Sequence, residues 1–250
     1  MGLFNRIFSK KELTIEPINL SFLRNDIHSH LIPGIDDGSP DMETTIILLK
    51  KFIDLGYKKV ITTPHIMSDY YKNTPEIILS GLDKVNEEII KNNLHIEIEA
   101  AAEYNLEPEF EDLLEKNNLL TFGTENYLLF ELSFFDEPPR LNEIIWKMRE
   151  KGLSPVLAHV ERYGYWHKDY DKIEEMINRG VKIQVNIGSI IGAYGPEVKK
   201  VAEKLIEDKV INFVGSDCHH EQHLEMINHA SRLPIFHSLI QQEQILNKSL

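Results

Sequence analysis

The sequence predicts an α/β protein whose parallel sheet is curled like a barrel. Short runs rich in β-branched residues alternate with segments in which apolar residues recur every three or four positions. Such alternation favours a parallel sheet with helices packed on it. Periodicity does not show closure, so an open doubly wound sheet remains an alternative. The predicted strands are Arg24–His28, Lys59–Thr63, Ile96–Ala101, Tyr127–Leu132, Pro155–His159, Val181–Ile187 and Ile211–Gly215.

Two of the intervening segments show the helical spacing most clearly. Residues 46–53 and 198–206 place apolar side chains on one face of a helix. Ser39-Pro40-Asp41 is typical of a helix start, with a capping residue and a proline near the first turn. Helix ends are predicted at three glycines, Gly56, Gly152 and Gly180. Neither a Gly-x-Gly-x-x-Gly fingerprint after the first strand nor a Walker A loop is present.

The 250 residues predict one domain at 22–250, preceded by an arm at 1–21. No internal repeat or low-complexity linker divides the chain. The arm could form a short helix with apolar and basic residues, namely Leu3, Phe4, Ile7, Phe8, Arg6, Lys10 and Lys11. It is interpreted either as a weak peripheral anchor on an acidic membrane surface or as a frayed or packed tail.

Composition excludes several classes of protein. A net charge of −13 argues against a general nucleic-acid binder, because Lys and Arg must meet the phosphates. Bound cations would still allow an anionic substrate. The single cysteine, Cys218, excludes an internal disulfide and fits a reducing compartment. A cysteine-based phosphatase would need an arginine where Leu224 stands. Without a secretory signal or a bilayer-length apolar run, we expect a cytoplasmic protein.

Residues that commonly bind metals follow almost every predicted strand. The C-terminal ends of barrel strands meet around one mouth, so residues far apart in the sequence are expected to converge there. The strand-end residues are Asp26, His28, His30, Asp36, Asp37, His65, Glu103, Glu131, His159, Glu161, Arg162, Asn186, Asp217 and His219.

The chemistry of these residues predicts a metal site. Neutral imidazole and carboxylate suit Zn, Mn and Fe. His28 and His30 stand two positions apart on an extended segment, so they point the same way and can bind one ion. Glu103 and Glu131 follow apolar strands, where a carboxylate is costly unless it is paired or metal-bound. The remaining histidines are interpreted as surface residues, namely His95, His167, His220, His223, His229 and His237. Of these, His220 and His223 could reach the site.

In order along the chain, these motifs resemble those of the PHP (polymerase and histidinol phosphatase) superfamily. They are most similar to the CpsB/YwqE type of bacterial protein-tyrosine phosphatase, from Asp26 to His219. The motifs are D-I-H-S-H-L-I-P-G-I-D-D-G at 26–38, T-T-P-H at 62–65, A-E-Y at 102–104, E-L-S at 131–133, A-H-V-E-R-Y at 158–163 and S-D-C-H at 216–219.

This resemblance implies a distorted seven-stranded (β/α) barrel of the TIM-like kind and a cluster of three divalent metal ions, Mn or Fe, with Zn as an alternative. By motif position, the first ion would be bound by His28, His30, Glu103 and Asp217. Glu103 would bridge to the second ion, which Glu131 and His159 would also bind. The third ion would be bound by Asp37, His65 and His219. The Asp-Gly step of the motif favours Asp37 over Asp36. Arg162 stands where the family has an arginine that contacts the phosphate.

The implied reaction is hydrolysis of a phosphomonoester without a covalent intermediate. A hydroxide that bridges two ions would attack phosphorus, while the remaining ion and Arg162 hold the non-bridging oxygens. The implied substrate is a phosphotyrosine protein, in particular a bacterial tyrosine kinase of capsule or exopolysaccharide synthesis at the inner face of the membrane.

Alternative functions remain open. A small-molecule phosphatase such as histidinol phosphatase is the nearest, and a barrel nuclease or amidohydrolase is more distant, because amidohydrolases expect a histidine where Asn186 stands. A non-catalytic kinase-binding module would lack ligands, and none is missing. The loop after His65 lacks the basic residues of some family members. In that loop, Tyr70 and Tyr71 could stack on an aromatic phosphoester or pack as a lid.

Overall fold

A computed structural model describes residues 13–250, and its strands all pair in parallel. The α/β class with a curled parallel sheet is therefore confirmed. The strands are β1 (Asn25–Asp26), β2 (Lys59–Thr62), β3 (His65–Ile66), β4 (Glu97–Ala100), β5 (Glu103–Asn105), β6 (Tyr127–Glu131), β7 (Ser154–Leu157), β8 (Lys182–Asn186) and β9 (Phe213–Gly215).

The described residues form nine strands where the sequence predicts seven, because two predicted segments each continue as a second short strand. The sheets run in the orders β1-β2-β4 and β3-β5-β6-β7-β8-β9. Pro64, which has no N–H to donate, separates β2 from β3. Hydrogen bonds continue across both breaks, from the N–H of Ala101 to Thr62 O at 2.9 Å and from the N–H of Glu103 to Pro64 O at 3.1 Å.

Backbone contacts also join the first and last strand segments. Ser29 and Cys218 form a parallel bridge, and the N–H of Asp217 donates to His28 O at 2.8 Å. At the other end, the side chain of Asn247 donates to Asn25 O and Val214 O. The ends of the curled sheet are therefore held together just below the predicted ligands.

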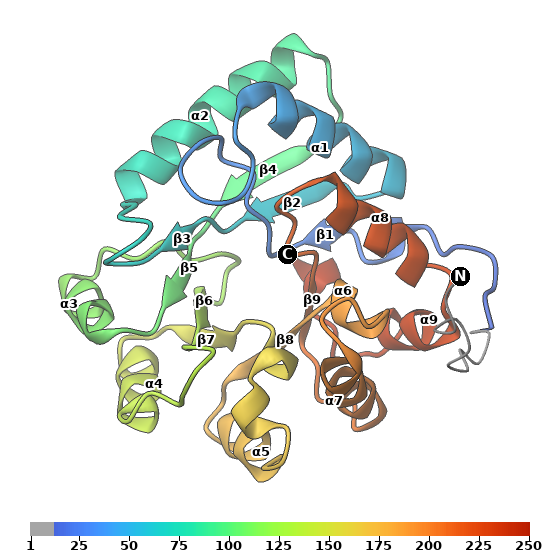
Figure 1. Cartoon of the computed structure of the whole chain (residues 1–250). Coiled ribbons are helices and arrows are strands. Elements are labelled where there is room, and N and C mark those ends of the chain that lie inside the picture. The colour runs from blue at the N-terminus through green and yellow to red at the C-terminus, as the bar shows by residue number, and fades with distance from the viewer. Residues whose placement is uncertain (1–12) are drawn as a thin grey trace, which may run out of the picture.

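The helices lie around the outside of the strands (Figure 1). The long helix α1 begins at Asp41, which accepts a hydrogen bond from the Thr44 N–H, and it ends at Gly56 with φ of 100°. The predicted start is thus right except that Pro40 precedes the cap. The helices are α1 (Met42–Leu55), α2 (Pro75–Lys91), α3 (Pro108–Lys116), α4 (Leu141–Glu150), α5 (Asp171–Asn178), α6 (Ile187–Ile190), α7 (Pro196–Glu207), α8 (Glu221–Ala230) and α9 (Pro234–Ile240).

Two apolar clusters use alternate residues of the strands, as the two-residue period of a strand requires. Val60 and Leu128 belong to the large cluster, which also contains the buried faces of the helices. Their neighbours Ile61 and Leu129 belong to a smaller cluster on the opposite face, with Phe213. Because both faces of most strands are packed, the ligand-type side chains gather at the strand ends, where the site lies.

Part of the predicted arm lies outside the described residues, namely 1–12. Its remainder pairs with the chain after α8, since the N–H of Ile15 donates to Arg232 O and that of Ile18 to Ser231 O, both at 2.9 Å. The division into an arm and one domain stays a prediction. No helix in residues 13–250 has the length and apolar character needed to span a bilayer.

Candidate metal centre

The strand ends surround a pocket of about 460 Å³. Its lining includes seven of the nine predicted ligands, and the other two, His28 and His30, are fully buried beside it. The lining ligands are Asp37, His65, Glu103, Glu131, His159, Asp217 and His219. Residues far apart in the sequence therefore converge in the structure, as predicted.

Glu103 lies at the centre of a buried group that we call the floor cluster: His28, Glu103, Glu131, His159 and Asp217. One Glu103 oxygen, Oε2, is 3.2 Å from His28 Nε2 and 3.1 Å from His65 Nδ1. The other, Oε1, is 3.0 Å from His159 Nε2. Both carboxylate oxygens of Glu103 thus face imidazole nitrogens from different strands, as a bridging ligand would.

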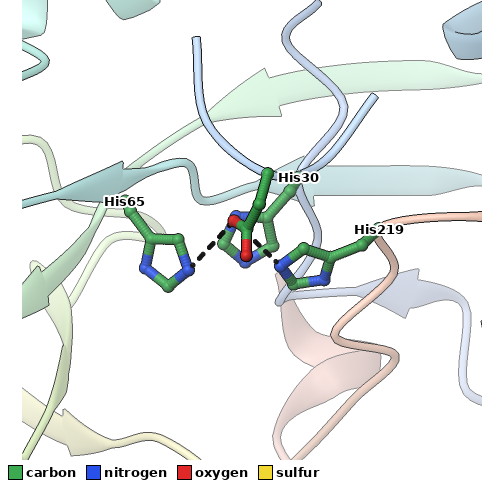
Figure 2. Close-up of side chains that lie close together, drawn as sticks. His30, His65 and His219 are labelled. Carbon is green, nitrogen blue, oxygen red and sulfur yellow. Dashed lines mark ion pairs between the residues drawn. The ribbon is translucent and has the colours of Figure 1, made fainter. Parts of the chain in front are cut away.

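A second group, the rim cluster, consists of Asp37, His65 and His219. Asp37 Oδ1 is 3.6 Å from His65 Nε2 and 3.5 Å from His219 Nε2. Figure 2 shows the rings of His65 and His219 on either side of His30. His30 stacks on His219 with centroids 4.0 Å apart, and its Nε2 is also 3.5 Å from Glu103 Oε2, so it lies between the two clusters.

Among residues 13–250 there are four sets of potential ligands, and within each set the ligand atoms all lie within 4.8 Å of one another, as atoms around one cation must. They are His30, Asp37, His65 and His219; His28, His30 and Glu103; His28, His159 and Asp217; and His65, Glu103 and Glu131. His30 belongs to two of them, which the sequence does not predict. Imidazole and carboxylate donors in this proportion suit Zn, Mn or Fe.

Several buried ligand atoms in the centre have no hydrogen-bond partner of acceptable geometry. They include His28 Nε2, His30 Nε2, His65 Nδ1, Glu103 Oε2 and Glu131 Oε1. Leaving a buried polar atom unpaired is costly, and cations bound between these atoms would satisfy them. The donor set therefore fits a group of divalent ions.

The pKa values of the buried histidines reflect the carboxylates and imidazoles packed around them. Burial alone lowers the pKa of His28, but the carboxylates of Glu103 and Asp217 outweigh it and raise the value to about 10. Burial likewise lowers the pKa of His65, whereas Glu103 and Glu131 raise it to about 9. Burial lowers the pKa of His30 to about 4, with the neighbouring His219 and His65 contributing. Carboxylates at this density attract positive charge, whether protons or metal ions.

A family model described as capsular polysaccharide synthesis, CpsB/CapC, matches residues 24–231. The chain belongs to the CpsB/CapC family. It is 30% identical to the tyrosine-protein phosphatase YwqE of Bacillus subtilis over 194 residues, which are 78% of this chain and 76% of YwqE. Identity to the tyrosine-protein phosphatase CpsB of Streptococcus pneumoniae is 26%, over 78% of this chain and 82% of that one.

A solved structure agrees with this membership of the CpsB/CapC family. It is described as YwqE from Bacillus subtilis and CpsB from Streptococcus pneumoniae, unique metal-dependent tyrosine phosphatases. The present chain superposes on it with a TM-score of 0.79 and 26% identity, over 90% of each chain. The predicted family resemblance is confirmed.

Two ligand-type residues of this CpsB/CapC chain have left-handed backbones, which are unusual outside glycine. His159 has a φ of 33° and Asp217 a φ of 51°. Each is fixed by a neighbour: the His159 N–H donates to Gln184 Oε1 at 2.9 Å, and the Asp217 N–H donates to His28 O. Backbone strain of this kind is found where the surroundings hold a functional side chain in place.

A buried amide pair on β8 supports the floor cluster. Gln184 Oε1 lies 3.1 Å from His28 Nδ1, and Gln184 Nε2 donates to Asn186 Oδ1 at 2.9 Å. Asn186 Nδ2 in turn donates to Asp217 Oδ2 at 2.7 Å. Sequence reasoning missed Gln184, although it shares a strand face with Asn186 through the two-residue period.

Asp36 and Asp37, adjacent in the sequence, have different surroundings. Asp36 Oδ2 is 2.8 Å from His30 Nδ1, and Asp36 Oδ1 accepts from the Gly38 N–H at 3.0 Å. Asp37 instead faces the pocket. Gly38 packs so closely on His30 that a Cβ would lie 2.3 Å from the His30 Cβ, which explains the Asp-Gly step of the motif.

The remaining predicted residues lie at the pocket wall. Arg162 lines it, and its NH1 donates to Asp217 Oδ2 at 3.1 Å. Tyr71 lines it too and stacks on His65 at 5.5 Å, whereas Tyr70 is 83% exposed. Of the histidines interpreted as surface residues, two reach the wall: His220 and His223. Phe134 and Tyr194 also line the pocket, and no sequence pattern marks them.

Proposed function

We propose that this chain is a metal-dependent protein-tyrosine phosphatase that hydrolyses phosphotyrosine on proteins of capsule synthesis. One observation carries the proposal: nine ligand-type side chains from separate strand ends converge on or beside one pocket, with unpaired buried donor atoms facing one another. The named relatives of the CpsB/CapC family, tyrosine phosphatases described as metal-dependent, support it.

We further propose three divalent ions, Mn or Fe with Zn as an alternative. The contacts of His28 and His30 with Glu103 and Asp217 support these four residues as ligands of the first ion. Glu103, Glu131 and His159, whose ring lies near both carboxylates, would hold the second. Asp37, His65 and His219, with His30 behind them, would hold the third. The contacts of Asp36 support a role in orienting His30, so Asp37 is the proposed ligand. Such second contacts fix the ring and its tautomer.

Divalent ions held by these residues would supply a lowered pKa for bound water and positive charge opposite the phosphate. Arg162 reaches the same pocket with a planar fork of donors, and we propose that it binds the non-bridging phosphate oxygens. A phenolate leaves readily, so no strong general acid is required. Tyr71 forms an aromatic wall of the pocket that suits a phenyl ester.

The proposal also covers the partner protein, contact with the membrane, the form of the barrel and the location in the cell. A bacterial tyrosine kinase would be the phosphoprotein partner, and the arm at 1–21 would provide weak contact with the inner membrane face. The hydrogen bonds that join the two segments across both breaks, from Ala101 to Thr62 and from Glu103 to Pro64, support the treatment of β2 with β3 and of β4 with β5 as two bent strands of a seven-stranded barrel. A cytoplasmic location stays a prediction.

A metal-reconstituted activity panel tests the function. The purified chain, loaded in turn with Mn, Fe and Zn, is assayed on phosphotyrosine peptides, histidinol phosphate and nucleotides. We expect turnover on phosphotyrosine peptides well above the others, lost on chelation. Preferential hydrolysis of histidinol phosphate would establish the small-molecule alternative, and no turnover with every metal would favour a binding module.

Two variants make the panel specific to the site. His65→Ala and Glu131→Ala should each abolish turnover while the circular dichroism spectrum is unchanged, because each removes a pocket-facing donor. His95→Ala is the matched control, since His95 is exposed. Full activity in either site variant would contradict the proposed centre.

A further inference from the structure

The guanidinium of Arg162 is flanked by two aromatic rings. Its central carbon lies 4.8 Å from the centroid of Phe134 and 4.6 Å from that of Tyr194, both within the range of a cation–π contact. A ring over the face of a guanidinium occupies none of its five N–H donors. Its NH1 donates to Asp217 Oδ2. Donors therefore remain for an anion in the pocket.

Phe134 is held in position by the loop after β6. The Tyr165 hydroxyl donates to Ser133 O at 2.9 Å, and Trp166 Nε1 donates to Glu137 Oε2 at 2.8 Å. The loop is thus tied on both sides of Phe134. Its neighbour Phe135 is 93% exposed, whereas Phe134 is 44% exposed and lies over the guanidinium of Arg162.

Tyr194 is held by the glycines around it. A Cβ on Gly188 would lie 3.3 Å from Tyr194 Cε2, so the ring packs directly on the backbone of α6. Gly192 and Gly195 have φ of 81° and 102°, conformations that other residues rarely adopt. These turns place the ring beside Arg162.

We propose that Phe134 and Tyr194 are positioning residues that hold the Arg162 guanidinium ready for a phosphate dianion in the pocket. A free arginine side chain loses considerable rotamer entropy on binding, and a side chain fixed beforehand loses less. The rings also cover part of the guanidinium, so that the Arg162 side chain is only 26% exposed, and partial removal from water strengthens its attraction for an anion. The inference rests on the proposed function of the pocket.

The test measures binding of inorganic phosphate to the metal-loaded full chain by calorimetry. Phe134→Leu and Tyr194→Leu should each raise the dissociation constant about 3- to 30-fold, the range from a solvent-exposed to a desolvated cation–π contact. Tyr194→Phe keeps the ring and should bind within twofold of the wild type. Phe135→Leu, on the same loop, should have no effect.

A double-mutant cycle shows whether the rings act through Arg162. In an Arg162→Lys background, Phe134→Leu should weaken phosphate binding less than twofold. In the wild-type background, KM for a phosphotyrosine peptide should rise with the phosphate dissociation constant while kcat stays within about threefold. Metal content and thermal midpoint serve to check the fold.

Several results would overturn the inference. They are unchanged phosphate binding in either leucine variant, an equal effect of Phe135→Leu, an equal loss in Tyr194→Phe, and a full Phe134→Leu effect without Arg162. Phosphate binding does not require turnover. A wild-type chain that binds phosphate but hydrolyses no phosphoester would therefore refute the proposed function while leaving this inference testable.

Discussion

The floor and rim clusters use the same kinds of side chain in different surroundings. In the floor, His28 is tied to Gln184, and Asp217 to Asn186 and Arg162. In the rim, the Asp37 side chain is 54% exposed, and within residues 13–250 its ion pairs are with His65 and His219 alone. The floor is buried and supported from behind, whereas the rim is open on its pocket side.

This difference predicts two classes of metal site. A ligand whose second polar atom is already bonded is fixed before the ion arrives, so little entropy is lost on binding. The exposed Asp37 must be ordered when the ion binds, and its charge is screened by solvent. We therefore expect the floor ions to be tightly held and the rim ion to exchange more readily.

The largest expected effect is at Glu103, which touches both clusters. Glu103→Gln keeps the size but removes the charge that faces His28, His65 and His159. We expect loss of metal from both clusters, measured by elemental analysis, and at least about a thousandfold loss of activity.

Glu99→Gln is the matched control, because Glu99 lies on β4 with its side chain 52% exposed. It should keep wild-type metal content and activity. A Glu103→Gln protein that retains its full metal content would break the idea that one carboxylate joins the two clusters.

Asp37→Asn should distinguish the rim cluster from the floor cluster. It removes the carboxylate shared by His65 and His219 but leaves the floor intact, so we expect loss of the rim ion alone and roughly a hundredfold drop in activity. Asp69→Asn, an exposed change in the loop after His65, is the control. Equal metal loss from rim and floor would show that the two are not distinct.

Gln184→Met tests the support beneath the floor. The apolar side chain fills the space but cannot bond to His28 or Asn186. Loss of such a second contact typically weakens metal affinity about 10- to 100-fold, and we expect the floor to weaken while the rim does not. Gln241→Met, an exposed change, is the control. Competition with a metal chelator measures both affinities.

The floor cluster could be predicted from the sequence far better than the loop residues that line the pocket. His28 and His30 are two residues apart, and Glu131 ends a buried strand, so local periodicity places them. The parallel sheet then brings the strand ends together. The short strands β3 and β5 follow breaks and contain too few residues to show a period, which is why seven strands were expected.

The residues that sequence reasoning missed depend on contacts between loops. The role of Asp36 against the His30 ring is one of these, since the turn at Gly38 decides which of the two adjacent aspartates faces His30, and residue periodicity does not separate them. Phe134 and Tyr194 sit in loops of no periodicity, about sixty residues apart, and only the folded chain brings both to Arg162. Tertiary contacts of this kind leave no local pattern.

The smallest expected effect is the release of protons when metal ions bind. Metal ions bind neutral imidazole. In the floor, burial lowers the pKa of His28 but Glu103 raises it to about 10; in the rim, burial lowers that of His65 but Glu103 raises it to about 9. Both rings are therefore protonated at pH 8 before metal binds, whereas His30, with a pKa lowered to about 4 by burial, is already neutral.

Metal uptake should consequently release at least about one proton per cluster. Affinity should rise up to about tenfold per pH unit for each proton, until pH reaches about 9 for the rim and about 10 for the floor. Calorimetry at pH 8 in buffers of different ionisation enthalpy counts these protons. The wild type should release at least about two, and Asp37→Asn, without its rim ion, about one fewer. Proton release that is unchanged in Asp37→Asn would mean that all the displaced protons come from the floor, and the two clusters would then differ in charge as well as in burial.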